Sequence, residues 1–314
     1  MPAVGFKCPN DMGYVYWNDG TFLEKCRLCP NQCMASPALQ AAAQQRPWKG
    51  KPSVTQLINP TLPTYLAIVN DFFIEPMSTI ASMIGTNSHQ AFENAQPNNW
   101  LAEVRLEDDI TSGQFDAYDT STKTLWDWKF FGAFRIAKAL GYTPRWTKKI
   151  ITRGKNKGQE KWEQVFEYGG VRDIREIAIQ LNYYRYLMEK QGLEVKNIKV
   201  NMFLRGGLDA TAKRYGLTQQ AYIVPINFIS KQWVRKYMVM KYDALMRALQ
   251  EYHDDIEGRE EKRIPKCLSF CNKRDRWDNS KTYPDRKCRD WCSVHEFCPY
   301  WQENYGGAAG FLAE

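Results

Sequence analysis

The alternation of apolar and polar residues predicts a mixed α/β protein. Period-two patterns rich in β-branched and aromatic residues indicate strands at 100–106, 197–204 and 221–229. Apolar residues three and four apart indicate helices at 78–95, 173–190 and 230–253, with shorter helical segments at 55–69 and 130–140. The helix at 78–95 is expected to bury one side, formed by Ile80, Met83, Ile84 and Phe92. We therefore expect a mixed central sheet of about four or five strands flanked by helices.

Two acids and a lysine lie on a predicted hairpin in the middle of the chain. The stretch 113–129 reads as two short strands, with Asp119-Thr-Ser-Thr as turn chemistry between them. A tight hairpin brings Asp116 close to Asp127, and Lys129 shares the strand face of Asp127 because side chains two apart point the same way. Two neighbouring buried carboxylates are costly unless a cation lies between them, and oxygen ligands suit Mg²⁺ or Mn²⁺. The pattern predicts a divalent-metal site with Lys129 beside it; the alternative is an exposed strand pair.

Further polar residues lie on the predicted helices and on one strand. His89 is on the helix at 78–95, where a histidine can also be structural or solvated. Gln180 and Tyr184 are one turn apart on a common face of the helix at 173–190; alternatively, Tyr184 is core and Gln180 an exposed amide. Glu103, on the strand at 100–106, faces either the same cleft or solvent.

The order of these residues resembles the PD-(D/E)XK nuclease superfamily. The marks are His89, Asp116, Asp127-Trp-Lys129 and Gln180-x3-Tyr184, within about residues 80–190. They resemble the RecB-like exonuclease branch, which includes CRISPR-associated RecB-like exonucleases and phage relatives. The chain departs from that branch at Asn59-Pro60, where relatives with an iron–sulfur cluster often carry their first cysteine.

This resemblance implies a fold, an activity and a set of site residues. The fold would be a restriction-endonuclease-like mixed sheet, and the activity metal-dependent DNA cleavage. His89, Asp116 and Asp127 would bind Mg²⁺ or Mn²⁺, with Lys129, Gln180 and Tyr184 completing the catalytic group. The enzyme would be an exonuclease acting on single strands or duplex ends in replication, recombination or CRISPR adaptation, and a recombination or helicase protein is a candidate partner. The rival interpretation is a nucleic-acid-binding recombination partner whose nuclease core is only a scaffold.

A basic segment follows the hairpin. The chain carries 43 Lys and Arg against 35 acids, a net charge of +8, which fits a polyanionic partner. Within residues 145–162 there are seven basic residues and one acid, around a Gly-Lys-Asn-Lys-Gly tip. We expect a basic hairpin whose side chains contact the DNA backbone, namely Lys148, Lys149, Arg153, Lys155 and Lys157; the alternative is a solvated loop.

Nine cysteines gather near the two ends of the chain. Cys8, Cys26, Cys29 and Cys33 supply the four thiolates of a zinc ribbon, with free thiols as the alternative. In the tail, Cys288-x3-Cys292-x5-Cys298 is similar to the ending of RecB-like exonucleases that bind a [4Fe-4S] cluster, and zinc competes for the same site. Cys271 is the expected fourth ligand, with Cys267 as the alternative. Accordingly, we expect a zinc-ribbon-like module at 1–50, a nuclease core at 51–262 and a metal-binding tail at 263–314.

The expected compartment follows from the termini and the cysteines. The N-terminus has no basic segment leading into an apolar run, and no window approaches the about 18 apolar residues of a membrane span. Metal-binding thiols persist in a reducing compartment. We therefore expect a cytoplasmic protein of a bacterium, or of an infected host cell, with no membrane partner.

Overall fold

A computed structural model describes residues 3–10, 13–18, 21–256, 265, 268–277 and 283–306. The chain divides into two compact units, which are considered separately. The first unit comprises Met1–Asn87, Glu107–Gly113 and Arg235–Glu314, and the second comprises Ser88–Leu106 and Gln114–Val234. Within the described residues, no helix combines the length and the apolar character needed to cross a membrane.

The sheet at the centre of the second unit has five strands in the order β10-β9-β6-β5-β4. Their bounds are β4 (Trp100–Glu107), β5 (Ser112–Asp119), β6 (Thr124–Phe131), β9 (Asn197–Leu204) and β10 (Ala221–Pro225). β5 and β6 form an antiparallel hairpin, β6 and β9 are parallel, and β9 and β10 are antiparallel. The predicted mixed sheet is therefore confirmed, although β10 ends at Pro225 and is shorter than expected, since proline has no N–H to donate to the ladder.

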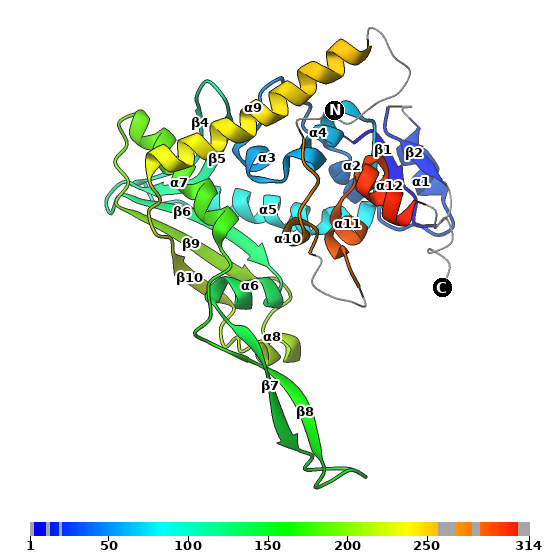
Figure 1. Ribbon diagram of the computed structural model, residues 1–314, viewed down its shortest axis with the longest axis vertical. Helices are drawn as coiled ribbons and strands as arrows, with labels where there is room; N and C mark the ends of the chain where they lie inside the picture. The colour runs from blue at the N-terminus through cyan, green and yellow to red at the C-terminus, as the bar shows by residue number, and fades with distance from the viewer. Residues whose placement is uncertain are drawn as a thin grey trace. The chain divides into compact units, whose positions relative to one another are not determined.

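Helices connect and flank this sheet (Figure 1). The second unit contains α6 (Ala133–Leu140), α7 (Arg175–Lys190) and α8 (Ala210–Arg214), together with the two-stranded ribbon of β7 (Thr143–Ile150) and β8 (Glu160–Glu167). The parallel neighbours β6 and β9 are joined by the long crossover that parallel strands need, which includes α6, the ribbon and α7. The helix predicted at 173–190 is confirmed as α7, and its buried residues include Ile177, Leu181 and Met188.

The first unit combines short helices with a small sheet in the order β2-β1-β3. Its early elements are β1 (Gly5–Lys7), β2 (Tyr14–Tyr16), α1 (Phe22–Leu28), α2 (Ser36–Ala42), α3 (Val54–Ile58), α4 (Thr61–Val69), β3 (Phe73–Ile74) and the 3₁₀ turn η1 (Pro76–Thr79). Its late elements are α10 (Lys273–Arg276), α11 (Arg286–Trp291), the 3₁₀ turn η2 (His295–Phe297) and α12 (Pro299–Tyr305). Two longer helices, α5 (Ile80–Asn94) and α9 (Lys231–Ile256), contribute residues to both units.

Local sequence signals explain where several helices begin. Ser53 accepts a hydrogen bond from the Gln56 N–H while the Gln56 side chain accepts one from the Ser53 N–H, a capping box that starts α3. Pro60 caps α4 and Pro63 lies inside its first turn, where the missing N–H has no intrahelical partner to lose. Pro60 therefore separates α3 from α4, whereas Pro63 is accommodated within α4.

The predicted buried side of the helix at 78–95 is wrong. The stretch divides into η1 and α5, and α5 has no buried residue: Ile80 and Ile84 are 37% and 42% exposed. Phe92 instead contributes a ring to an aromatic group on the sheet, with its centroid 5.5 Å from Trp128 and 5.3 Å from Phe203. A period of 3.6 identifies a helix but does not show which neighbours cover its apolar side.

The N-terminal segment does not complete a core with its own residues. Phe6, Phe22, Leu39 and Ala42 form a small buried cluster, and Ile74 and Met83 from the following elements pack against it. Strand β1 also pairs in parallel with β3, Gly5 opposite Phe73.

Candidate active site

The two acids of the β5–β6 hairpin meet where the strand pairing ends. The main-chain register runs from Asp119 opposite Thr124 to Ala117 opposite Trp126. One step further, the Trp128 N–H donates to Asp116 Oδ2 at 2.7 Å, so a carboxylate replaces a main-chain acceptor. The hairpin therefore fixes Asp116 beside Asp127 by both register and hydrogen bonding, as the sequence predicted.

A group of three potential metal ligands surrounds Asp116. His89 Nδ1 lies 3.4 Å from Asp116 Oδ1 and 3.4 Å from Glu103 Oε1. One ligand atom from each of these three residues lies within 4.8 Å of the others. The side chains are 27%, 11% and 20% exposed for His89, Asp116 and Glu103, so the group is largely shielded yet reachable from solvent. A nitrogen and carboxylate oxygens at this spacing form a donor set for a divalent cation.

Asp127 and Lys129 add an ion pair to the same site. The Asp127 side chain is 2% exposed, and its Oδ1 accepts from Lys129 Nζ at 2.7 Å. Its other oxygen, Oδ2, is buried and accepts no hydrogen bond from any described residue. A buried carboxylate oxygen without a partner is costly, so this atom is prepared for a ligand that the protein itself does not supply.

The charges in the site strongly perturb one another. Burial, followed by the negative charge of Asp127, raises the pKa of Asp116 well above its ordinary value, although Lys129 and the Trp128 N–H act in the opposite direction. For Lys129, burial lowers the pKa, but Asp127 and Asp116 outweigh it and raise the pKa above its ordinary value. Lys129 therefore stays positively charged beside two acids that repel each other.

Helix α7 adds the predicted glutamine and tyrosine. Gln180 Nε2 donates to the Tyr184 hydroxyl at 3.4 Å, across one helical turn. Burial raises the pKa of Tyr184, and the charges of Asp127 and Lys129 act on it as well. The Tyr184 hydroxyl is therefore close enough to the ion pair to interact with it, and it remains a neutral donor.

Sequence reasoning left the place of Glu103 open and did not consider Gln114. Gln114 Nε2 donates to Glu103 Oε2 at 2.8 Å, which orients the carboxylate toward His89. The Glu103 backbone has a φ of 48°, a left-handed conformation that is rare in a strand and costs about 1–3 kcal/mol. Such a backbone changes the direction of the side chain, and the residue pattern of β4 contains no signal for it.

The predicted basic hairpin is the β7–β8 ribbon. Two of its five predicted contact residues are ion-paired: Lys148 Nζ lies 2.7 Å from Glu160 Oε2, and Lys149 Nζ lies 3.0 Å from Glu163 Oε2. The other three lie at the tip, where the described residues provide no acidic partner; they are Arg153, Lys155 and Lys157. The ribbon therefore carries its unbalanced positive charge at the tip.

The N-terminal cysteines are electrostatic neighbours. Burial raises the pKa of Cys26, and the charges of Cys33, Cys8 and Cys29 raise it further. In the described part of the chain, however, no three cysteine sulfurs lie within 4.8 Å of one another. A tetrahedral zinc with bonds of about 2.3 Å would hold its sulfurs about 3.8 Å apart. The four thiols interact but are not at zinc-bound spacing.

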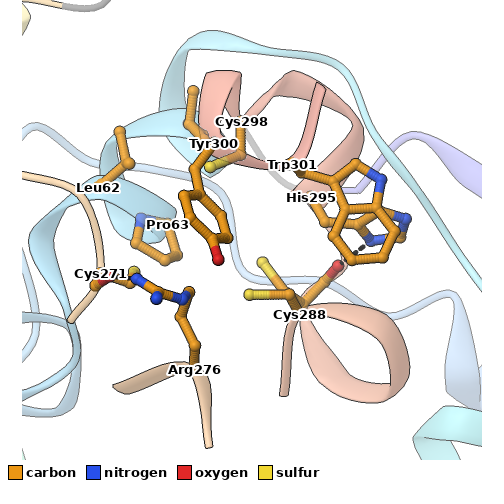
Figure 2. A pocket seen from close by; sticks show the side chains of 11 residues that line it. Leu62, Pro63, Cys271, Arg276, Cys288, His295, Cys298, Tyr300 and Trp301 are labelled. Carbon is orange, nitrogen blue, oxygen red and sulfur yellow. Dashed lines mark hydrogen bonds between the residues drawn. The ribbon is translucent and has the colours of Figure 1, made fainter. Parts of the chain in front are cut away.

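The tail cysteines line one pocket of the first unit. Figure 2 shows Cys271, Cys288 and Cys298 around it, and Cys292 also contributes to its wall. Burial, followed by the charge of Asp275, raises the pKa of Cys271 to about 12, and burial followed by Cys292 raises the pKa of Cys288 to about 12. Cys267, the alternative ligand, lies outside the described residues.

A buried aspartate organises the tail around this pocket. Asp285 is 2% exposed and accepts hydrogen bonds from Arg276 at 2.8 Å, Tyr300 at 2.6 Å and Tyr305 at 2.9 Å. The Arg276 guanidinium also lies 4.1 Å from the Tyr300 ring centroid. This network ties α10, α11 and α12 together.

Comparisons with known proteins give limited information. No protein-family model matches the sequence, and no curated protein matches it significantly. Among solved structures, the chain is similar to the crystal structure of a phage-related exonuclease from Haemophilus somnus 129PT. The identity is 10%, 66% of this chain and 96% of that chain are covered, and the TM-score is 0.36. A likeness this weak carries no functional conclusion.

Proposed function

We propose that this protein is a metal-dependent nuclease that hydrolyses phosphodiester bonds in DNA. The observation that carries the proposal is the buried Asp127 Oδ2, which has no hydrogen-bond partner among the described residues and belongs to the cluster of Asp116, Lys129 and Tyr184. A buried carboxylate oxygen without a hydrogen-bond partner lowers the stability of the fold, so we do not expect one in a cluster that serves only to stabilise the protein. A bound cation would offset this desolvation penalty and would give the cluster a chemical role.

The donor atoms fit Mg²⁺ or Mn²⁺. Carboxylate oxygens come from Asp116 and Asp127, with Glu103 as an additional donor, and oxygen ligands are what these cations prefer. His89 supplies an imidazole nitrogen, which Mn²⁺ accepts more readily than Mg²⁺. When bound, such an ion would polarise the scissile phosphate and ease deprotonation of the attacking water.

The remaining residues have roles that follow from their charge and position. Lys129, held by Asp127, is a fixed positive charge that can orient the attacking water and stabilise the negative charge developing on the phosphate. Tyr184 is a neutral hydroxyl donor, and Gln180 fixes the direction of that hydroxyl. These two residues can hold the phosphate against the metal and the lysine.

The proposed DNA substrate is supported by the resemblance in motif order to RecB-like exonucleases. We propose a PD-(D/E)XK nuclease within residues 51–262 that acts on single strands or duplex ends, in replication, recombination or CRISPR adaptation, with a recombination or helicase protein as partner. The rival proposal, a scaffold-only core in a nucleic-acid-binding protein, would require neither Lys129 nor the unpaired oxygen of Asp127. Both features favour an active enzyme.

We also propose that the tail binds a [4Fe-4S] cluster through Cys271, Cys288, Cys292 and Cys298. One observation supports a metal in the tail, because all four cysteines line one pocket. The choice of an iron–sulfur cluster rests on the similarity of the Cys288-x3-Cys292-x5-Cys298 spacing to RecB-like exonucleases, and zinc is the competing occupant.

For Cys8, Cys26, Cys29 and Cys33 the proposal remains a structural zinc ion. Metal analysis of anaerobically purified protein separates the two kinds of site, because an iron–sulfur cluster is brown and zinc is colourless. Cys292→Ser should remove the brown chromophore and lower thermal stability, because metal binding is coupled to the folding of this apolar-poor tail. Folded protein without iron or zinc in the tail would contradict the cluster and its zinc alternative alike.

The test of the main proposal is a cleavage assay on end-labelled DNA with Mn²⁺ and, separately, with excess EDTA. Asp127→Asn serves as the inactive variant, and Asp243→Asn, a change at an exposed aspartate of α9, is the matched control. We expect cleavage only with metal, retained in the control and lost in Asp127→Asn. Activity of Asp127→Asn within about threefold of the unmodified protein would overturn the assignment of the catalytic site.

A further inference from the structure

The β7–β8 ribbon exposes large apolar side chains that a soluble protein normally buries. Trp146 and Trp162 are 61% and 62% exposed, and Ile150 is 60% exposed. Within the described residues, no other aromatic ring stacks against either indole. Single exposed apolar residues are ordinary, but two tryptophans on one narrow ribbon form a surface available for binding.

The register places these side chains on one face. Lys148 is directly opposite Trp162, and Trp146 is opposite Gln164. Because side chains alternate along a strand, Trp146, Lys148 and Ile150 share the face of Trp162. The two indoles are therefore diagonal neighbours, about 7–8 Å apart at their α-carbons.

The other face of the ribbon is polar and charged. Arg145, Thr147 and Lys149 lie on it, opposite Val165, Glu163 and Lys161. Arg145 pairs with Glu167 at 3.0 Å, and Lys149 pairs with Glu163 at the same distance. The Lys148–Glu160 pair lies on the same face as the indoles, because Glu160 is opposite Ile150. The ribbon thus has one face that carries both tryptophans, the aromatic face, and one that is mainly polar, and cross-strand ion pairs on both faces help to hold the register without a core.

The base of the ribbon is anchored while the rest projects from its unit (Figure 1). The Gly170 N–H donates to the Gly141 carbonyl at 2.8 Å, and a Cβ on Gly141, whose φ is +87°, would lie 2.5 Å from the Gly170 oxygen. Phe166 packs edge-on against Tyr215 with 4.6 Å between ring centroids. These contacts fix the direction in which the ribbon leaves the unit.

Charge identifies the occupant of the aromatic face. The tip between the strands, residues 151–159, contains Arg153, Lys155 and Lys157 and no acid. Each ribbon strand has eight residues, an estimated length of about 27 Å, so the ribbon can follow several nucleotides. Flat indoles beside a basic tip are the combination that binds single strands, with bases stacked on rings and phosphates on cations. A duplex would hide the base faces that indoles contact.

We propose that the aromatic face of the β7–β8 ribbon is a binding site for single-stranded DNA. Unpaired bases stack on Trp146 and Trp162, and the backbone phosphates contact the tip cations. This inference rests on the proposed function only for the choice of DNA as the polymer. The site delivers a single strand to the protein and is separate from the cluster at Asp127.

The test measures binding in EDTA, where hydrolysis cannot contribute. Labelled oligothymidylate and a duplex of equal length are the probes. Trp146→Leu/Trp162→Leu removes the rings but keeps apolar side chains, and Trp146→Phe/Trp162→Phe keeps rings that can stack. We expect the leucine variant to bind oligothymidylate at least about 25-fold more weakly, about fivefold for each lost stack, and the phenylalanine variant to stay within about threefold. Circular dichroism and thermal melting check that each variant is folded.

Tryptophan fluorescence provides a second readout that a merely structural role would not change. Oligothymidylate should quench part of the emission of the unmodified protein, and the phenylalanine variant should lose that quenching while it still binds. Equal binding by the leucine variant, or tighter binding of the duplex than of the single strand by the unmodified protein, would overturn the proposal. So would self-association that only the leucine variant loses, since the ribbon would then be a contact between copies of this chain.

The failures of the two proposals can be distinguished. A protein that binds oligothymidylate through the tryptophans but never cleaves it with Mn²⁺ would keep the ribbon site and lose the nuclease. A protein that cleaves DNA with Mn²⁺ while the leucine variant binds and cleaves normally would keep the nuclease and lose the ribbon site.

Discussion

Two hairpins of the second unit, β5–β6 and β7–β8, depart from the usual pattern of buried apolar and exposed charged residues in opposite ways. The β5–β6 hairpin lies inside a sheet and buries charges, since Asp127 is 2% exposed and Asp116 is 11% exposed. Among the described strands, the β7–β8 ribbon has no further partner, and it exposes Trp146 and Trp162. Charges inside and indoles outside both lower stability in the isolated protein. We propose that a ligand accounts for each arrangement, a cation in one hairpin and a single strand in the other.

A β-hairpin can therefore serve different purposes, depending on the elements that pack against it. β6 is held by β5 on one side and by β9 on the other, so Asp127 and Lys129 are fixed in place, as catalysis requires. The ribbon has only its own cross-strand pairs, so it can adapt to a flexible polymer. Substitutions should therefore affect the rate of cleavage in the first hairpin and the affinity for DNA in the second.

Lys129→Met should have the largest effect. Loss of the fixed positive charge beside Asp127 is expected to lower the cleavage rate at least about a hundredfold while DNA affinity in EDTA stays within about twofold. Lys199→Met is the matched control, because Lys199 lies on the neighbouring strand with its Nζ over the Trp126 ring, on the opposite face of the sheet. Single-turnover kinetics measure the rate, and a normal rate in Lys129→Met would remove the distinction between the hairpins.

Glu103→Gln should show the next largest effect. The amide keeps the size of the side chain and can still accept from Gln114, but it lacks the charge that would attract a cation. We expect the Mn²⁺ concentration for half-maximal cleavage to rise about 10- to 100-fold, with activity recovering at high metal concentration. Glu107→Gln, on the same strand but 68% exposed, should leave the metal dependence unchanged. An unchanged dependence in Glu103→Gln would exclude this residue from the metal site.

The triple variant Arg153→Ala/Lys155→Ala/Lys157→Ala tests the tip of the ribbon. If each cation neutralises one phosphate, the slope of log affinity against log salt for oligothymidylate should fall by about 2, since each contact contributes about 0.7. A control with Lys190, Lys196 and Lys213 replaced by alanine removes the same charge from exposed positions outside the ribbon. Equal slopes in both triple variants would mean that the tip only adds to the overall charge.

Asp116→Asn should have the smallest effect, and its sign is favourable to stability. The pKa of Asp116 is raised in the folded protein by burial and by Asp127, so without metal the folded state loses stability as pH rises through that pKa. Asparagine removes this loss and can still accept from the Trp128 N–H. In EDTA at pH 8 the variant should be more stable to urea by about 1 kcal/mol, and the difference should vanish below pH 4, near the ordinary Asp pKa of about 3.9. A destabilised variant at pH 8 would contradict the repulsion between the two acids.

The sequence predicted correctly the features that depend on local residue patterns. The 113–129 hairpin, the 145–162 hairpin and the placing of Gln180 one turn from Tyr184 all follow from alternation, turn residues and helical spacing, and the structure confirms them. The meeting of Asp116 and Asp127 follows in the same way, because a tight hairpin has only a few possible registers.

Features that depend on distant partners could not be predicted. The Glu103 side chain is oriented by a left-handed backbone conformation within β4. The exposure of Ile80 and Ile84 depends on which other elements pack against α5. The net charge of the basic segment can be counted from its residues, but its ion pairs depend on the strand register. Lys148 pairs with Glu160 inside the predicted hairpin, and Lys149 pairs with Glu163, which lies beyond residue 162, where the predicted hairpin ended. Burial and cross-strand pairing are properties of the folded chain, so residue type alone does not determine them.

The most direct test of the proposed metal site is the position of a bound cation. Crystals soaked with Mn²⁺ should give one anomalous scattering peak beside Asp116 and Asp127, with His89 or Glu103 as a further ligand, and Asp127→Asn should lower its occupancy. Cleavage and the peak should require the same range of Mn²⁺ concentration. Cleavage of DNA with no ion at Asp116 and Asp127, or with the ion bound elsewhere, would contradict the proposed metal site.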